Sequence, residues 1–279
     1  NVYSLLKDHD IKMSDNMDTL GIIDYINENK SSSDPSEKFT PFIYEKILEI
    51  SISFEDFSKA TCAKKIVPGD WIWFKLKERL LHKKLDHFLY NEREGRLWIL
   101  NTSREGKIIG AQSRRMKGKG SRYLTYDISK LYETVLNTPL EESQEDLVQL
   151  NNISTLFGAL HVNFQSPTTV FEGPMDSLFM KNSIALCTVG RDTTKLDNIE
   201  TVRYMLDNDP AGMKKSIEKL KNGSSVFMWT KFIKDKNLDT YNIKDLNDLI
   251  KICYHNGIKI SLSDLNSYFT NHKLDIRYV

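Results

Sequence analysis

The chain has 279 residues, enough for one large domain or two modest ones with proper hydrophobic cores. Hydrophobic residues make up 40% and charged residues 28%, as in soluble globular proteins, and no apolar run is long enough to span a bilayer. The formal net charge of +1 excludes a global field that attracts polyanions, so any affinity for nucleic acid has to come from local charge. Three separated cysteines without a C-x-x-C pair predict neither a disulfide framework nor a zinc ribbon.

Residues 1–90 are expected to form a mostly helical N-terminal region. Asp18–Asn29 carries apolar residues at helical spacing, and a second helix is expected from about Thr40. The aromatic run Trp71–Phe74 leads into a charged helix that is expected to reach about Tyr90. Its two tryptophans are candidates for stacking on the bases of a single strand, although packing in a core or against a subunit is the commoner role of such a cluster.

Residues 91–165 are expected to form a basic α+β subdomain. Arg96–Thr102 and Lys107–Ser113 predict two antiparallel strands joined by a turn. Seven basic residues and one acid lie between Ser103 and Arg122, a local charge of about +6 in a nearly neutral chain. This concentration predicts a surface for a polyanion, with a solvated basic loop as the alternative. The basic residues are Arg104, Lys107, Arg114, Arg115, Lys117, Lys119 and Arg122.

Residues 166–255 are expected to form an α/β domain, followed by a C-terminal helix and tail over residues 256–279. The predicted order is β-α-β-β-α-β, which indicates a mostly parallel sheet with helices on both faces. The tail is expected to hold one amphipathic helix from about Ser263 and then to fray. The strands are predicted at Thr168–Gly173, Ile184–Val189, Thr201–Leu206 and Ser225–Trp229, and the helices after Gly173 through Asn182 and over Pro210–Asn222.

Carboxylates stand at the ends of two of these strands. One strand ends on Glu172, with Asp176 four residues later, and another ends on Asp207 and Asp209. The carboxyl edge of such a sheet is where α/β folds place their active sites. Asp207 and Asp209 are expected on the same side of an extended chain, roughly 6–7 Å apart at their Cα atoms. This arrangement suits Mg²⁺ or Mn²⁺, and two ordinary acidic strand ends are the alternative.

The Glu-Gly and Asp-x-Asp motifs, in this order, resemble the TOPRIM module of bacterial-type primases, topoisomerases and some nucleases. The segment Gly106–Gly110, followed by Arg114 and by Arg122-Tyr123-Leu124, is similar to the basic subdomain that precedes TOPRIM in those primases. The runs Glu172–Leu186 and Lys244–Asp248 are especially similar to primases of T-even-like phages. The likeness covers about residues 95–250.

The resemblance implies the catalytic core of a DNA primase, a nucleotidyltransferase that makes short RNA primers from ribonucleoside triphosphates on single-stranded DNA by two-metal catalysis with Mg²⁺ or Mn²⁺. It also implies a replicative helicase as partner and the cytoplasm of a bacterium or phage-infected host, with no membrane. The role of Glu172 is left open: it could act as a base, as an acid or as a metal ligand. The implied catalytic residues are Glu172, Asp207 and Asp209; the implied metal ligands are these three with Asp176 and Asp245; the implied contacts to nucleic acid or triphosphate are Arg114, Arg115, Lys117, Lys119, Arg122 and Tyr123.

Two other functions fit the same residues. A TOPRIM-type nuclease would use the acids to hydrolyse phosphodiesters, and a non-catalytic replication protein would bind single strands through the basic segment alone. Primases of this type normally carry an N-terminal zinc module, and this chain has no cysteine cluster. We therefore expect either a catalytic-core fragment or a protein that recruits its template differently.

Overall fold

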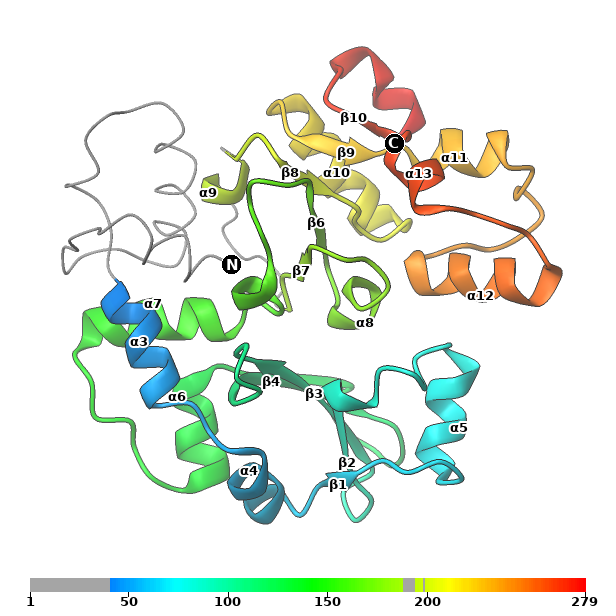
Figure 1. Cartoon of the computed structure of the whole chain (residues 1–279). Helices are drawn as coiled ribbons and strands as arrows, with labels where there is room; N and C mark the ends of the chain where they lie inside the picture. The colour runs from blue at the N-terminus through cyan, green and yellow to red at the C-terminus, as the bar shows by residue number, and fades with distance from the viewer. Residues whose placement is uncertain (1–40, 188–193, 198) are drawn as a thin grey trace.

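The computed structural model describes residues 41–187, 194–197 and 199–279. The helix expected over Asp18–Asn29 lies outside these residues. The described chain forms two five-stranded sheets, each accompanied by its own helices (Figure 1). Within the described ranges, no helix has the length and apolarity needed to cross a membrane.

The first sheet is antiparallel, with strands in the order β1-β2-β3-β4-β5. Strands β3 and β4 confirm the predicted strand pair, and the turn between them is closed by a hydrogen bond from Gly106 N to Ser103 O. Gly106 has a φ of 78°, which suits a residue without a Cβ atom. The strands are β1 (Lys64–Lys65), β2 (Phe88–Asn91), β3 (Arg96–Thr102), β4 (Ile108–Arg115) and β5 (Tyr123–Tyr126).

The expected helix from the aromatic run to about Tyr90 is wrong in its second half. Helix α5 spans Trp71–Glu78 and is followed by a turn, in which Leu80 has a φ of 59°. Phe88–Asn91 then forms strand β2 instead of helix. Phe88 and Leu89 are both fully buried, one in each of two hydrophobic cores, because pairing with β3 points them to opposite faces of the sheet.

The two faces of the first sheet enter different hydrophobic cores. Trp98 and Leu100 pack with the helices of the N-terminal half, whereas Leu97 and Ile99 join a core that includes Phe171 of the second sheet. This alternation follows the two-residue period of strand β3. One core therefore holds the two sheets together. The helices that accompany the first sheet are α3 (Pro41–Glu49), α4 (Phe54–Thr61), α5, η1 (Leu85–His87), α6 (Ile128–Leu131), η2 (Tyr132–Leu136), α7 (Gln144–Ser154) and η3 (Ala159–His161).

The second sheet has the strand order β10-β9-β8-β6-β7. Strands β7, β6, β8 and β9 pair in parallel, as predicted, and β10 pairs antiparallel with β9. The strands are β6 (Thr168–Phe171), β7 (Ser183–Ala185), β8 (Val202–Tyr204), β9 (Ser225–Phe227) and β10 (Phe269–Thr270). The helices are α8 (Pro174–Ser177), α9 (Thr194–Asp197), α10 (Pro210–Lys221), α11 (Trp229–Asp235), α12 (Leu246–Asn256), α13 (Leu262–Asn266) and η4 (Lys273–Tyr278).

Two expectations for this half are wrong. The helix after Gly173 ends at Ser177 rather than Asn182. Asn182 itself has a φ of 52°, outside the helical region, and its side chain donates hydrogen bonds to the carbonyls of a neighbouring loop. The C-terminal tail does not fray after its helix, since Phe269–Thr270 adds strand β10 to the sheet. Phe269 packs against Phe227, 5.2 Å away between ring centroids, and so closes the exposed edge of β9.

Candidate active site

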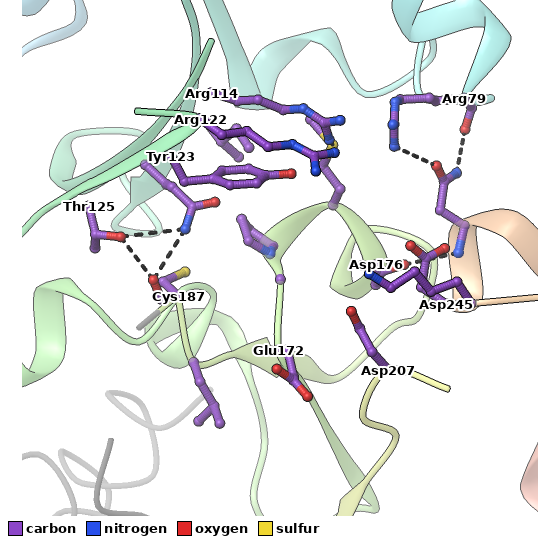
Figure 2. Close-up of a pocket in the computed structure, with 18 of the residues that line it drawn as sticks. Arg79, Arg114, Arg122, Tyr123, Thr125, Glu172, Asp176, Cys187, Asp207 and Asp245 are labelled. Atoms are coloured by element: carbon purple, nitrogen blue, oxygen red, sulfur yellow. Dashed lines mark hydrogen bonds between the residues drawn. The ribbon is translucent and has the colours of Figure 1, made fainter. Parts of the chain in front are cut away.

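A cavity of about 720 Å³ lies between the two sheets and is lined by residues from both (Figure 2). Five basic and five acidic side chains line it. Arg114, Arg122 and Tyr123 face Glu172 and Asp207 across the space in Figure 2. The basic residues are Arg79, Arg114, Arg122, Lys215 and Lys244, and the acidic residues are Glu172, Asp176, Asp207, Asp245 and Asp248.

The sheet topology brings the acids together. Strands β6 and β8 are parallel neighbours, so Glu172 and Asp207, which follow them, emerge at the same edge of the sheet. Asp176 is in helix α8, directly after β6. Asp245 is the N-cap of helix α12, where its Oδ1 accepts a hydrogen bond from Asp248 N at 2.7 Å. Four carboxylates singled out in the sequence therefore line one cavity.

Burial and repulsion between carboxylates raise the pKa values of three aspartates in the cavity. Burial is the main cause that raises the pKa of Asp207 to about 7, with further contributions from the charges of Glu172 and Asp245. Burial and then the charge of Asp245 raise the pKa of Asp176 to about 8. The pKa of Asp245 is also raised, chiefly by burial. A cation bound beside these aspartates would favour their ionised forms and so lower their pKa values.

Glu172 supplies a further sign of a cation site. Its Oε2 accepts a hydrogen bond from Lys215 Nζ at 3.1 Å, whereas its buried Oε1 has no partner among the described residues. No three described His, Cys, Asp or Glu side chains are already gathered into a metal-binding group. Mg²⁺ needs no such group, because it keeps several waters and takes one or two carboxylates together with substrate phosphates. The donor set thus fits Mg²⁺ or Mn²⁺ held jointly with a substrate.

Asp209 has a different environment from Asp207. Its Oδ1 caps helix α10 by accepting hydrogen bonds from the backbone of Ala211 and Gly212, and its Oδ2 lies 3.1 Å from Lys244 Nζ. The hydrogen bond from Gly212 is the main cause that lowers the pKa of Asp209. Asp209 is not among the residues that line the cavity. We expected both aspartates on the same side of the chain. Instead, Asp207 lines the cavity and Asp209 caps a helix.

Helix α10 is held against the backbone of Asp207. A Cβ atom on Gly212 would lie 2.0 Å from the Asp207 carbonyl oxygen, so only glycine allows this approach. The start of the helix and the acidic strand end are consequently packed as one rigid unit.

The basic side of the cavity is built on strands β4 and β5. Arg114 is only 8% exposed, and burial is the main cause that lowers its pKa, followed by the charge of Arg79. The ring of Tyr123 lies 5.3 Å from the guanidinium carbon of Arg114 and 5.5 Å from that of Arg122. Such contacts orient the guanidinium groups without neutralising them. The cavity therefore has a preorganised positive wall.

The rest of the predicted basic segment lies elsewhere. Arg115 follows Arg114 on a strand, where consecutive side chains point to opposite faces, and its Nη1 donates to Glu94 O at 3.4 Å. Lys117 lies over the ring of Trp71, with Nζ 3.9 Å from the ring centroid. Lys119 is exposed. Neither Arg115, Lys117 nor Lys119 lines the cavity, so the segment has two separate parts.

Three basic residues of the cavity were not predicted. Arg79 comes from the end of α5, far upstream of the acids, and no local pattern marks it. Lys215 is on α10, where it pairs with Glu172. Lys244 directly precedes Asp245, and only the acids of that run were considered. Of the three basic residues, it is the one that could most easily have been predicted from the sequence.

Asn247 joins Arg79 to the acids. Its Oδ1 accepts a hydrogen bond from Arg79 Nη1 at 3.1 Å, and its Nδ2 donates to Arg79 O at 2.7 Å. Its backbone N donates to Asp176 Oδ1 at 2.9 Å. The side chain is 1% exposed, so this link between the two halves of the protein is shielded from water.

No protein-family model matches the chain, and no curated protein matches it. Among solved structures, the chain is similar to the RNA polymerase domain of Mycobacterium tuberculosis primase DnaG, at 12% identity and a TM-score of 0.42, over 90% of this chain and 82% of that one. It is also similar to the zinc-binding and RNA polymerase domains of Aquifex aeolicus primase, at 16% identity and a TM-score of 0.34, over 85% of this chain and 64% of that one.

A third similar structure is a DnaG primase catalytic domain bound to single-stranded DNA, at 15% identity and a TM-score of 0.32, over 75% of this chain and 72% of that one. The chain spans less than two thirds of the Aquifex aeolicus chain. All three likenesses are distant.

Proposed function

We propose that the chain is a TOPRIM-type DNA primase core that joins ribonucleoside triphosphates into short RNA primers on single-stranded DNA. The observation that carries this proposal is the cavity between the sheets, where acids with raised pKa values face a fixed positive wall. Nucleotidyl transfer needs both features at once, because it joins a polyanionic substrate to an attacking hydroxyl at a metal. A solvated cluster of acids, by contrast, would show neither raised pKa values nor arginines held opposite.

The acids Glu172, Asp176, Asp207 and Asp245 would hold Mg²⁺ or Mn²⁺. Bound there, the metal would lower the pKa of the attacking hydroxyl and neutralise charge on the triphosphate. In the reaction, the hydroxyl oxygen forms a bond to the α-phosphorus, and the bond to the leaving pyrophosphate breaks. Glu172, whose Oε1 has no partner among the described residues, is our candidate to accept the hydroxyl proton.

The positive wall would bind the phosphates. Arg114 and Arg122 are oriented by Tyr123, and their guanidinium groups can form paired hydrogen bonds to phosphate oxygens. Arg79 adds a third guanidinium at the end of α5. Because Arg114 is desolvated, its hydrogen bonds to a phosphate would be stronger than those of a surface arginine.

Primer synthesis on single-stranded DNA, with labelled ribonucleotides and Mg²⁺ or Mn²⁺, tests the proposal. We expect the wild type to make short RNA products and Asp207→Ala to make none. Asp209→Asn is the matched control, since its parent residue caps a helix outside the cavity, and it should lose far less activity than Asp207→Ala.

If the template is shortened in a metal-dependent way and no RNA product forms, the protein is a nuclease and not a primase. No product and no shortening, with binding of single strands intact, would favour the non-catalytic protein. Equal activity of Asp207→Ala and the wild type would refute the proposed site. A replicative helicase as partner stays a prediction, which a pull-down with the purified helicase would test separately.

A further inference from the structure

A second cavity, of about 710 Å³, lies where strand β1, the turn between β2 and β3, and the start of α5 meet. It shares no lining residue with the active-site cavity. Its walls include Lys64, Lys65, Trp71, Tyr90, Arg93 and Lys117.

The ring of Trp71 in this cavity is available to a ligand. Trp71 is 39% exposed although it is the largest kind of apolar side chain. Its ring lies 6.2 Å from that of Tyr90, tilted by 40°, and Lys117 Nζ covers part of it. The hydroxyl of Tyr90 is buried and has no hydrogen-bond partner among the described residues. A buried hydroxyl without a partner is costly, and a polar ligand in the cavity would supply one.

The charges of the cavity favour an anion. Lys64, Lys65, Arg93 and Lys117 line it, against the two carboxylates Asp70 and Glu92. Within the described part of the chain, none of these four cations forms an ion pair with a carboxylate. Asp70 is already engaged, since its Oδ2 accepts a hydrogen bond from Val67 N at 3.0 Å. Cations beside an exposed aromatic ring are the combination that binds single-stranded nucleic acid, through phosphate contacts and base stacking.

The position of Lys117 is set by the backbone. The amides of Met116 and Lys117 donate to Gly95 O at 2.7 and 3.2 Å, and Gly95 has a φ of 62°. A Cβ atom on Gly95 would lie 2.9 Å from Lys117 O. This close approach ties the beginning of the basic loop, residues 116–122 between β4 and β5, to the turn between β2 and β3. Arg122, at the other end of the loop, lines the active-site cavity, so the loop connects the two cavities.

We propose that this second cavity binds one nucleotide of the DNA template outside the active site. Its base stacks on Trp71, its phosphate contacts the lysines, and the strand continues along the basic loop toward the acids. The choice of the template as ligand rests on the proposed function, whereas binding of a single strand here does not require catalysis.

Binding of a labelled dT12 oligonucleotide to the full chain, followed by fluorescence anisotropy, tests the site. Since one stacked base is worth about 1–3 kcal/mol, Trp71→Ala should weaken binding about 5- to 150-fold, and Trp71→Phe should recover part of the loss. Phe74→Ala is the matched control, because Phe74 is 51% exposed on the same helix but does not line the cavity, and it should bind like the wild type.

The phosphate contacts are tested by salt. Lys64 lies opposite Tyr90 of the cavity, whereas Lys65 lies over the ring of Phe54. The double variant Lys64→Ala/Lys117→Ala should therefore lower the log–log slope of affinity against salt by about 1.4, since each contact to a single strand contributes about 0.7. An unchanged slope would overturn the assignment of the lysines. Wild-type affinity of Trp71→Ala, an equal loss in Phe74→Ala, or no binding of dT12 by the wild type at low salt would overturn the site.

Two comparisons separate this inference from the function proposed above. A larger effect of Trp71→Ala on rU12 than on dT12 would overturn the template as ligand and assign the cavity to the RNA product. If the wild type makes no primers but Trp71→Ala weakens dT12 binding, the proposed function fails and the site stands. If the wild type makes primers and Trp71→Ala binds dT12 normally, the proposed function stands and the second site fails.

Discussion

Replacing Asp207 by asparagine should stabilise the metal-free protein at alkaline pH. The pKa of this carboxyl rises from 3.8 to about 7 on folding, mainly through burial. Between these values the folded protein holds a proton that the unfolded protein releases, so wild-type stability falls as the pH rises through this window. Asparagine has nearly the same shape and no charge to bury, and therefore avoids this loss.

The size of the effect follows from the shift in pKa. At 1.36 kcal/mol for each unit, a rise from 3.8 to about 7 corresponds to about 4 kcal/mol. Asp207 is only partly buried, and screening by solvent reduces this to about 2 kcal/mol. The melting temperature of Asp207→Asn at pH 8 should therefore exceed that of the wild type by about 4 °C, and the difference should vanish below pH 3.8.

Thermal unfolding in EDTA at several pH values measures this difference, and Asp209→Asn is the control. The pKa of Asp209 is lowered in the folded protein, so its substitution should not stabilise at pH 8. Asparagine is as good a helix cap as aspartate, and the loss of the partly exposed pair with Lys244 should cost about 0–1 kcal/mol.

Saturating Mg²⁺ adds a second comparison, because binding to the folded state alone raises stability. The melting temperature of the wild type should rise more than that of Asp207→Asn, since the variant has lost a proposed ligand. A variant less stable than the wild type at pH 8 in EDTA would refute the electrostatic reasoning. An equal response to Mg²⁺ would refute Asp207 as a ligand.

Two further variants probe how the site is held together. Gly212→Ala should cost about 1–3 kcal/mol in urea unfolding because its Cβ would overlap the carbonyl of Asp207, whereas Gly173→Ala, with its nearest neighbour at 3.6 Å, should cost less; similar losses would contradict the packing argument. Asn247→Ala should cost about 1–3 kcal/mol because it removes the partly buried hydrogen bond that the Arg79 carbonyl accepts, and primer synthesis should fall with it; unchanged unfolding would show that this link contributes little.

Much of the second sheet could be predicted from sequence because its signals are local. The strands at Thr168–Phe171 and Val202–Tyr204 are short apolar runs that end on acids, and Pro210 marks the start of α10. Parallel strands carry such acids to a common edge whatever the rest of the chain does. Glu172 and Asp207 were therefore correctly expected to lie in one place.

The departures arise where pairing with another strand overrides a local pattern. Phe88–Asn91 reads as the continuation of a helix, but pairing with β3 makes it a strand. The C-terminal tail has little local sequence pattern, but Phe269 pairs with the edge strand β9 and packs against the ring of Phe227. The partner of β10 lies far upstream, so the sequence of the tail carries no signal of that pairing.

By itself, the sequence determined which residue types stand at the strand ends and therefore that an acidic edge forms. Only the tertiary structure decided that Asp207 lines the cavity while Asp209 caps a helix, and that Arg79 and Asn247 reach the same acids from another part of the chain. The physical reason is that local patterns specify backbone direction and which face is buried, whereas the environment of a charged side chain depends on which distant groups pack against it.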